Sequence, residues 1–297
     1  MNKLIYKVLK RYYNKFGGPD LEYQIENFKI WLPFSHKLPE YQRLFKNYDK
    51  KLKVILKNLE KFKKTSVIID IGANVGDTAA VFRSYSSARI VCIEGEEFFL
   101  NYLRRNSKII PNIEIVETFV IGNNGKLMGE VRRTDGTAKI ITSSVFENGV
   151  QMLNTKPLMK ILKENEIDPE MIDLIKIDTD GFDFNILQGN RDIIEMVKPN
   201  LFFEYDISFN KEDFEASVKV ISILENLGYK FIVYDNFGNL LDFVTKECTM
   251  KFTRFNQYLM SCRVNGGGIY YFDLFATVDQ SLADKIIQYD TLSEEIF

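Results

Sequence analysis

Two stretches of the sequence place charged residues and glycine at the ends of apolar runs, a pattern typical of ligand-binding loops. The first runs from Asp70 to Asp77 and contains Gly72, Asn74 and Gly76. Glycine lets the backbone turn tightly and approach a ligand, and the start of a following helix offers free N–H groups. Because the turn follows an apolar run that reads as a strand, it predicts a binding loop at the carboxyl end of that strand.

The residue types in this loop favour a cationic ligand that lacks phosphate. A dinucleotide-binding loop would read G-x-G-x-x-G, but Asn74 and Asp77 occupy two of these glycine positions, and a carboxylate repels phosphates. Asp70 suits a sulfonium or an ammonium group. Glu94 ends the next predicted strand, about twenty residues after the loop, where a carboxylate can accept hydrogen bonds from both ribose hydroxyls. A nicotinamide-dependent dehydrogenase is therefore the less favoured alternative.

The second stretch, residues 173–181, puts a lysine inside an apolar strand and two carboxylates at its end. Lys176 would be costly if it were buried without a partner, because burial disfavours its charged form. Glu204, at the end of the apolar run that follows, is the expected partner. Their pair either braces the sheet or positions a substrate. The carboxylates at the strand end are Asp178 and Asp180.

Several of these residues are candidates for catalysis. Asp178, Asp180 and Glu204 offer the oxygen ligands that Mg²⁺ or Mn²⁺ prefers, and a bound cation lowers the pKa of a coordinated hydroxyl. Without a metal, Asp180 or Glu204 is the expected general base, and Lys176 would position the substrate. His36 is the only histidine and would titrate in a suitable range. The alternative for His36 is a surface or capping role.

Short β-rich runs alternate with helical stretches from residue 65 onward, which indicates βαβ units and a parallel sheet. We therefore expect an α/β fold with a seven-stranded, mostly parallel sheet flanked by helices. The predicted strands are 67–71, 89–94, 113–120, 174–178, 201–205, 230–234 and 269–277, and the predicted helices are 76–84, 96–106, 158–165, 182–188 and 214–226.

The predicted organisation has three parts. Residues 1–64 form a helical cap, residues 65–278 the main domain with a β-rich insertion at about 122–142, and residues 279–297 a tail. The first sixteen residues read as a basic amphipathic helix, which either packs on its own domain or on a sister subunit of a homo-oligomer, or contacts an anionic membrane surface or another partner.

Composition excludes several classes of protein. The chain is 45% hydrophobic, which is enough for a packed core, and its 39 basic and 41 acidic residues are interspersed, so no strong field favours nucleic acid. The three cysteines are odd in number and lack metal-site spacing, which favours a reducing, cytoplasmic setting. We expect neither a spanning segment nor a secretion signal.

Together these stretches resemble the FkbM family of methyltransferases. The family loop Asp-Ile/Val-Gly-Ala-Asn-x-Gly stands here as residues 70–76. Its Ile-Lys-Ile-Asp-x-Glu-Gly strand end stands as residues 175–181, followed by Leu-x-Gly at 187–189. The resemblance covers residues 67–206. Asp180 stands where the family usually has Glu, and Gly95 stands where proline is common.

The resemblance implies a class I methyltransferase, or Rossmann-like, fold with S-adenosylmethionine as the methyl donor. It also implies O-methylation of a carbohydrate hydroxyl, here of a nucleotide sugar or a surface glycan. A non-catalytic, cofactor-binding subunit of a glycan-assembly complex is a further alternative. The residues expected to bind the cofactor are Asp70, Gly72, Asn74, Gly76, Asp77, Thr78, Glu94, Gly95, Phe119 and Asp178.

Overall fold

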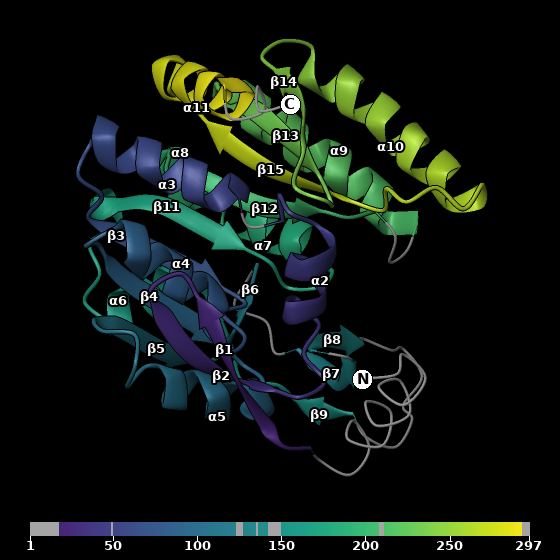
Figure 1. Ribbon diagram of the computed structural model, residues 1–297. Coiled ribbons are helices and arrows are strands. Elements are labelled where there is room, and N and C mark those ends of the chain that lie inside the picture. The colour runs from purple at the N-terminus through teal and green to yellow at the C-terminus, as the bar shows by residue number, and fades with distance from the viewer. Residues whose placement is uncertain are drawn as a thin grey trace.

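The computed structural model describes residues 18–48, 50–122, 127–134, 136–141, 150–207 and 211–292. They form an α/β fold around one large mixed sheet (Figure 1). The expected α/β class is confirmed, but the sheet has eight strands and not seven. In spatial order the strands are β14 (Leu240–Val244), β13 (Lys230–Asp235), β15 (Phe272–Thr277), β12 (Asn200–Tyr205), β11 (Ile172–Ile177), β3 (Val67–Ile71), β4 (Arg89–Glu94) and β5 (Ile113–Glu117).

The five strands from β12 to β5 run parallel, whereas β15, β13 and β14 each pair antiparallel with their neighbours. All five residues of β3 are buried, as expected for a parallel strand covered on both faces. The eighth strand, β14, adds to the edge through a tight turn from β13. The parallel strands therefore bring their carboxyl ends to one edge of the sheet, where the loops of the site begin.

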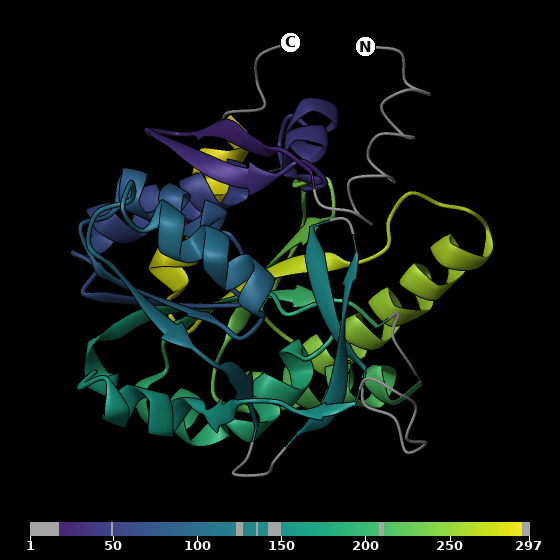
Figure 2. The same ribbon diagram turned by 90° about the horizontal axis from the view of Figure 1, so that it is seen from below.

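Helices cover both faces of the sheet and give the molecule two apolar cores. Figure 2 shows the two helical layers on opposite sides of the strands. On one face lie α3 (Lys50–Phe62), α4 (Asp77–Tyr85), α5 (Glu97–Asn106) and α11 (Gln280–Leu292). On the other lie α6 (Leu158–Glu164), α7 (Asp183–Gly189), α8 (Arg191–Val197), α9 (Lys211–Asn226) and α10 (Cys248–Val264).

Two of the expected elements are wrong in detail. The strand predicted over 113–120 breaks at Thr118, and the chain then forms β6 (Phe119–Ile121), which pairs with β10 (Thr155–Pro157) outside the main sheet. The break is fixed by Thr118, whose Oγ1 donates a hydrogen bond to Asn154 O. The tail expected from residue 279 is instead largely the helix α11, because its apolar residues pack against α3 and the sheet.

The segment before the first sheet strand begins with the hairpin of β1 (Asp20–Ile25) and β2 (Phe28–Pro33), followed by α2 (Leu38–Leu44) and α3. Apolar residues of α3 pack in the core that also contains α4 and α11, so α3 belongs to the helical layer of the main domain. A separate cap remains a prediction. The basic helix expected in the first sixteen residues lies outside the described residues.

The insertion expected at about 122–142 contains an antiparallel hairpin of β7 (Met128–Thr134) and β8 (Thr137–Ile141). A further short strand, β9 (Gln151–Met152), pairs with β7. Among the described helices, none is long and apolar enough to cross a membrane.

Candidate active site

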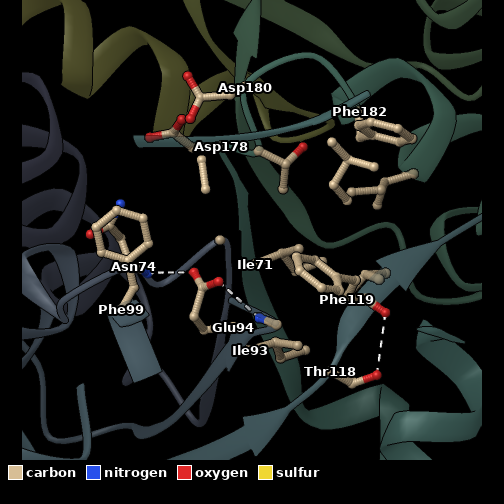
Figure 3. A pocket seen from close by; sticks show the side chains of 17 residues that line it. Ile71, Asn74, Ile93, Glu94, Phe99, Thr118, Phe119, Asp178, Asp180 and Phe182 are labelled. Carbon is tan, nitrogen blue, oxygen red and sulfur yellow. Dashed lines mark hydrogen bonds between the residues drawn. The ribbon is translucent and has the colours of Figure 1, made fainter. Parts of the chain in front are cut away.

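A cavity opens at the carboxyl ends of β3, β4 and β11 (Figure 3). Its residues surround about 580 Å³ of space, which includes solvent at the open mouth. The loops after three parallel strands and the hairpin β7–β8 supply its walls. The lining residues are Ile71, Gly72, Asn74, Ile93, Glu94, Gly95, Phe99, Thr118, Phe119, Val120, Ala138, Ile140, Asp178, Thr179, Asp180, Phe182 and Ile186.

The loop after β3 lies directly against the end of β11. Gly72 has φ +77°, and a Cβ atom on it would lie 2.0 Å from the carbonyl oxygen of Asp178. Only glycine can therefore occupy this position without moving the strand end. The next polar residue, Asn74, also has a left-handed backbone, with φ 49°. This tight contact between two loops forms the floor of the cavity.

Lys176 lies beneath that floor and pairs with Asp70, not with Glu204. Its Nζ atom is 3.2 Å from Asp70 Oδ1 and 3.5 Å from Asp178 Oδ2, and it donates a hydrogen bond to Gly72 O. The expected partner was wrong because Lys176 stands level with Asp70 on β3 and with Phe202 on β12, two residues short of Glu204. Burial disfavours the charged lysine, but the carboxylates of Asp70 and Asp178 outweigh it and raise the pKa of Lys176.

Glu94 ends β4 and is held rigidly at the cavity wall. Its Oε2 accepts a hydrogen bond from Asn74 N at 2.9 Å, and its Oε1 accepts from the backbone N–H groups of Gly95 and Glu96, both at 2.8 Å. Figure 3 shows the Glu94 carboxylate beside the loop that carries Asn74. Burial raises the pKa of Glu94, while the three backbone donors oppose that shift. Oε1 already accepts two hydrogen bonds, whereas Oε2 accepts one and can still accept another from a ligand.

Two aromatic side chains, Phe99 and Phe119, line the same cavity as Glu94. The ring of Phe119 covers Gly95 so closely that a Cβ atom there would lie 2.4 Å from the ring. Phe99, near the start of α5, lines the cavity as well. Gly95 therefore leaves room for Phe119 where a larger residue would displace it.

The hairpin β7–β8 forms the outer wall of the cavity through Ala138 and Ile140. The Asn74 side chain donates a hydrogen bond from Nδ2 to Gly136 O at 3.0 Å. This bond connects the hairpin to the loop that follows β3. His36 lies on the other side of Gly136, buried, and its Nδ1 accepts a hydrogen bond from Leu38 N. His36 does not line the cavity.

Two carboxylates, Asp178 and Asp180, line the cavity on the side away from Glu94, as Figure 3 shows. Asp180 has a left-handed backbone, with φ 51°, a strained conformation often found at functional sites. Burial and the neighbouring charge of Asp178 raise the pKa of Asp180 to about 7. A carboxylate with such a pKa can exchange a proton near neutral pH.

Asp183 supports the turn that carries Thr179 and Asp180. It was not among the site residues predicted from the sequence. Its Oδ2 accepts hydrogen bonds from Thr179 N at 3.1 Å and from Thr179 Oγ1 at 2.7 Å. Burial, with the charge of Asp178, raises the pKa of Asp183 to about 7. The carboxylate three residues after Asp180 was the available signal, because an acidic side chain in the first turn of a helix can reach back to a preceding backbone N–H group.

Glu204 ends β12 and lies next to Asp273 of β15 in the antiparallel register. Asp273 forms a buried ion pair with Lys51 of α3. Burial and the charges of Asp178 and Asp183 raise the pKa of Glu204 well above its usual range. Glu204 is not among the residues that line the cavity.

The metal site predicted from Asp178, Asp180 and Glu204 is not formed. Within the part of the chain that the structure describes, no group of three His, Cys, Asp or Glu side chains is placed to hold a metal ion. Asp178 and Asp180 line the cavity, whereas Glu204 does not, and Asp178 is paired with Lys176 at 3.5 Å.

Six of the ten residues expected to bind a cofactor line the cavity, namely Gly72, Asn74, Glu94, Gly95, Phe119 and Asp178. The others have different surroundings. Asp70 is completely buried beside Lys176, and Asp77 and Thr78 line a small cavity on the α2 side of the loop. Gly76 is buried as well. The apolar wall residues of β8, Ala138 and Ile140, were not expected, since their position depends on how the hairpin folds back.

The chain is similar in sequence to one known domain family, and several solved structures resemble it over part of its length. A family model described as the methyltransferase FkbM domain matches residues 70–231, which is more than half of the chain. No curated protein matches.

The solved structures include methyltransferase FkbM from Methylobacillus flagellatus (18% identity, 63% of this chain and 52% of that chain, TM-score 0.36). They also include precorrin-6y C5,15-methyltransferase from Geobacter metallireducens (17%, 61% and 72%, TM-score 0.37). A third is a putative O-methyltransferase from Klebsiella pneumoniae (11%, 93% and 99%, TM-score 0.42). On the extent of the family match, this protein belongs to the FkbM methyltransferase family.

Proposed function

We propose that this methyltransferase transfers a methyl group from S-adenosylmethionine to a hydroxyl group of a carbohydrate, either a nucleotide sugar or a surface glycan. The observation that carries the proposal is the position and the raised pKa of Asp180. Its carboxylate lines the cavity, and burial brings its pKa to about 7, as a base acting on a hydroxyl requires.

The residues of the cavity fit the donor. Glu94 suits a ribose hydroxyl, because backbone N–H groups fix its carboxylate and Oε2 keeps further acceptor capacity. The Phe119 ring lines the cavity and suits stacking on a flat base. Asn74 Oδ1 is buried and lacks a hydrogen-bond partner among the described residues, so it can accept a bond from a ligand in the cavity. Asp178 and Asp180 place negative charge near the loop of Gly72, which suits a sulfonium and an ammonium group.

S-adenosylmethionine supplies a methyl group bound to a positively charged sulfur, which is electrophilic at carbon. A sugar hydroxyl is a weak nucleophile, so the protein must orient it and accept its proton. Asp180 lines the cavity and can accept that proton, since its ionised form dominates above a pH of about 7. Asp183 holds the turn that carries Asp180 through its two bonds to Thr179. The apolar walls formed by Ile140 and Phe182 exclude water.

The test is Asp180→Asn, which keeps the size of the side chain and removes the base. We expect S-adenosylhomocysteine formation with a panel of nucleotide sugars and glycans to fall about 10²- to 10⁴-fold. The matched control is Asp192→Asn on α8, whose exposed side chain is outside the cavity. The wild-type rate should rise as pH increases through about 7, and this limb should vanish in Asp180→Asn.

Two outcomes would count against the proposal. If Asp180→Asn kept the wild-type rate and pH profile, Asp180 would not be the base. If the protein bound S-adenosylmethionine but methylated no carbohydrate in the panel, the non-catalytic alternative would be favoured.

A further inference from the structure

We infer that Arg133 is a positioning residue for the methyl donor, which holds the hairpin β7–β8 over the cavity through its contacts with the start of α5. The inference rests on the proposed binding of S-adenosylmethionine in that cavity. It concerns the donor and not the acceptor, and Arg133 itself does not line the cavity.

One side of the hairpin faces the cavity, and Arg133 lies on that side. Ala138 and Ile140 of β8 line the cavity. In the antiparallel register Arg133 of β7 stands directly opposite Ala138. Residues opposite each other in such a pair share a face of the sheet, so the Arg133 side chain is on the same face as the cavity wall. Arg132, one position earlier, lies on the other face.

Arg133 connects the hairpin to the first residues of α5. Its Nε atom lies 3.6 Å from Glu96 Oε1, and its guanidinium lies over the Phe98 ring, 4.8 Å from the ring centroid. A guanidinium gains from both kinds of contact. In the described part of the chain, β7 and β8 pair with each other and β7 with β9, but neither pairs with the main sheet (Figure 1). Side-chain contacts such as those of Arg133 therefore fix where the hairpin lies.

A second contact holds the tip of the hairpin, where Asn74 Nδ2 donates a hydrogen bond to Gly136 O. Both contacts end on residues that hold Glu94. The backbone N–H of Asn74 donates to Glu94 Oε2, and that of Glu96 donates to Glu94 Oε1. The hairpin is thus attached to the same two residues that fix the carboxylate expected to bind the ribose.

The Glu96 side chain is itself held in place. Its Oε2 accepts a hydrogen bond from Phe99 N at 3.1 Å, and the side chain is only 13% exposed. A partner that is already fixed loses little rotamer freedom when it pairs with Arg133. With this contact in place, the apolar wall of Ala138 and Ile140 stays over the bound donor. Without it, the hairpin opens more often and the donor leaves faster.

The experiment measures how fast S-adenosylhomocysteine, the product form of the donor, dissociates from the full-length protein in surface plasmon resonance. We expect Arg133→Ala to raise the dissociation rate about threefold to thirtyfold, the combined effect of a partly exposed ion pair and a cation–π contact. Arg133→Lys keeps the charge but loses the planar guanidinium, so its rate should lie between the two. The matched control is Arg132→Ala, which removes an arginine paired with Glu130 on the other face of the same strand and should leave the rate unchanged.

Two further measurements separate positioning from a purely structural role. Arg133→Ala should have a smaller effect in a Glu96→Gln background, because one of the two contacts is then already weakened while an oxygen remains to cap α5. The midpoint of urea denaturation should be the same in Arg133→Ala and the wild type, since the hairpin lies outside the main sheet.

Three results would overturn the inference: a wild-type dissociation rate in Arg133→Ala, an equal rise in Arg132→Ala, or an effect of the same size with and without Glu96→Gln. A lower urea midpoint with an unchanged dissociation rate would show that Arg133 only stabilises the fold. If the wild-type protein bound no S-adenosylhomocysteine, the proposed donor would fail together with this inference. The first three results leave that donor intact, so the two failures are distinguishable.

Discussion

Single residues in the site have roles that differ from those their type suggests. Asp70 has the charge to bind a sulfonium, but it is completely buried and holds Lys176 beneath the loop. Glu94 has the same charge and faces the cavity, because three backbone N–H groups fix its carboxylate there. Burial and nearby charge give Asp180 a pKa suited to proton transfer, although an exposed aspartate would be ionised at neutral pH.

At this scale the prediction concerns Glu94. Replacing Glu94 by alanine should weaken binding of S-adenosylmethionine by about 1.5–3 kcal/mol, since a charged hydrogen-bond acceptor is lost. Calorimetric titration measures the change. The matched control is Glu117→Ala, because Glu117 stands level with Glu94 on the neighbouring strand but is exposed and pairs with Arg104. Equal affinities in Glu94→Ala and the wild type would rule out the ribose role.

Among the elements, the pairing of β3 with β11 connects the sheet to the site. It sets Asp70 beside Lys176 and brings the carbonyl of Asp178 against Gly72. The strands themselves were predictable from their apolar runs. The helix α10 was not predictable, because its apolar residues are spread over several faces and give no clear helical stripe. The break after β5 was not predictable either, because it depends on the hydrogen bond from Thr118 to the distant Asn154.

The prediction for these elements is a pair of substitutions. Lys176→Met should lower the free energy of unfolding by about 3–5 kcal/mol, because it leaves Asp70 buried without a partner. Adding Asp70→Leu should restore much of that loss. Urea denaturation measures both. Lys63→Met serves as the control, since Lys63 is largely exposed and pairs with Asp173 of β11, the strand that carries Lys176. This substitution should lower the free energy of unfolding by less than about 1 kcal/mol. A double variant no more stable than Lys176→Met would contradict the explanation.

For the whole molecule, the buried carboxylates couple stability to pH. Asp183 has a pKa of about 7 in the folded protein, well above that of an unfolded aspartate. Between these two values the folded state holds a proton that the unfolded state has lost. Stability from this group is therefore present at low pH and is lost as pH rises towards 7.

The resulting prediction is that the free energy of unfolding of the ligand-free protein decreases from about pH 4 to about pH 7. Asp183 contributes a slope of at most about 1.4 kcal/mol per pH unit. Asp183→Asn should flatten the dependence, as measured by urea denaturation at several pH values. Asp168→Asn, at an exposed position outside the site, should not. An unchanged slope in Asp183→Asn would show that its pKa is not raised.

The sequence by itself determined the α/β class, the binding loop of residues 70–77 and the strand ends that carry Glu94, Asp178 and Asp180. It could do so because apolar runs, glycines and charges form local patterns. Tertiary structure decided which of these groups meet. Strand order and register set Lys176 level with Asp70 and leave Glu204 two residues beyond its reach. They also bring the hairpin β7–β8 over the cavity. Such contacts join residues far apart in the chain, and no local pattern specifies them.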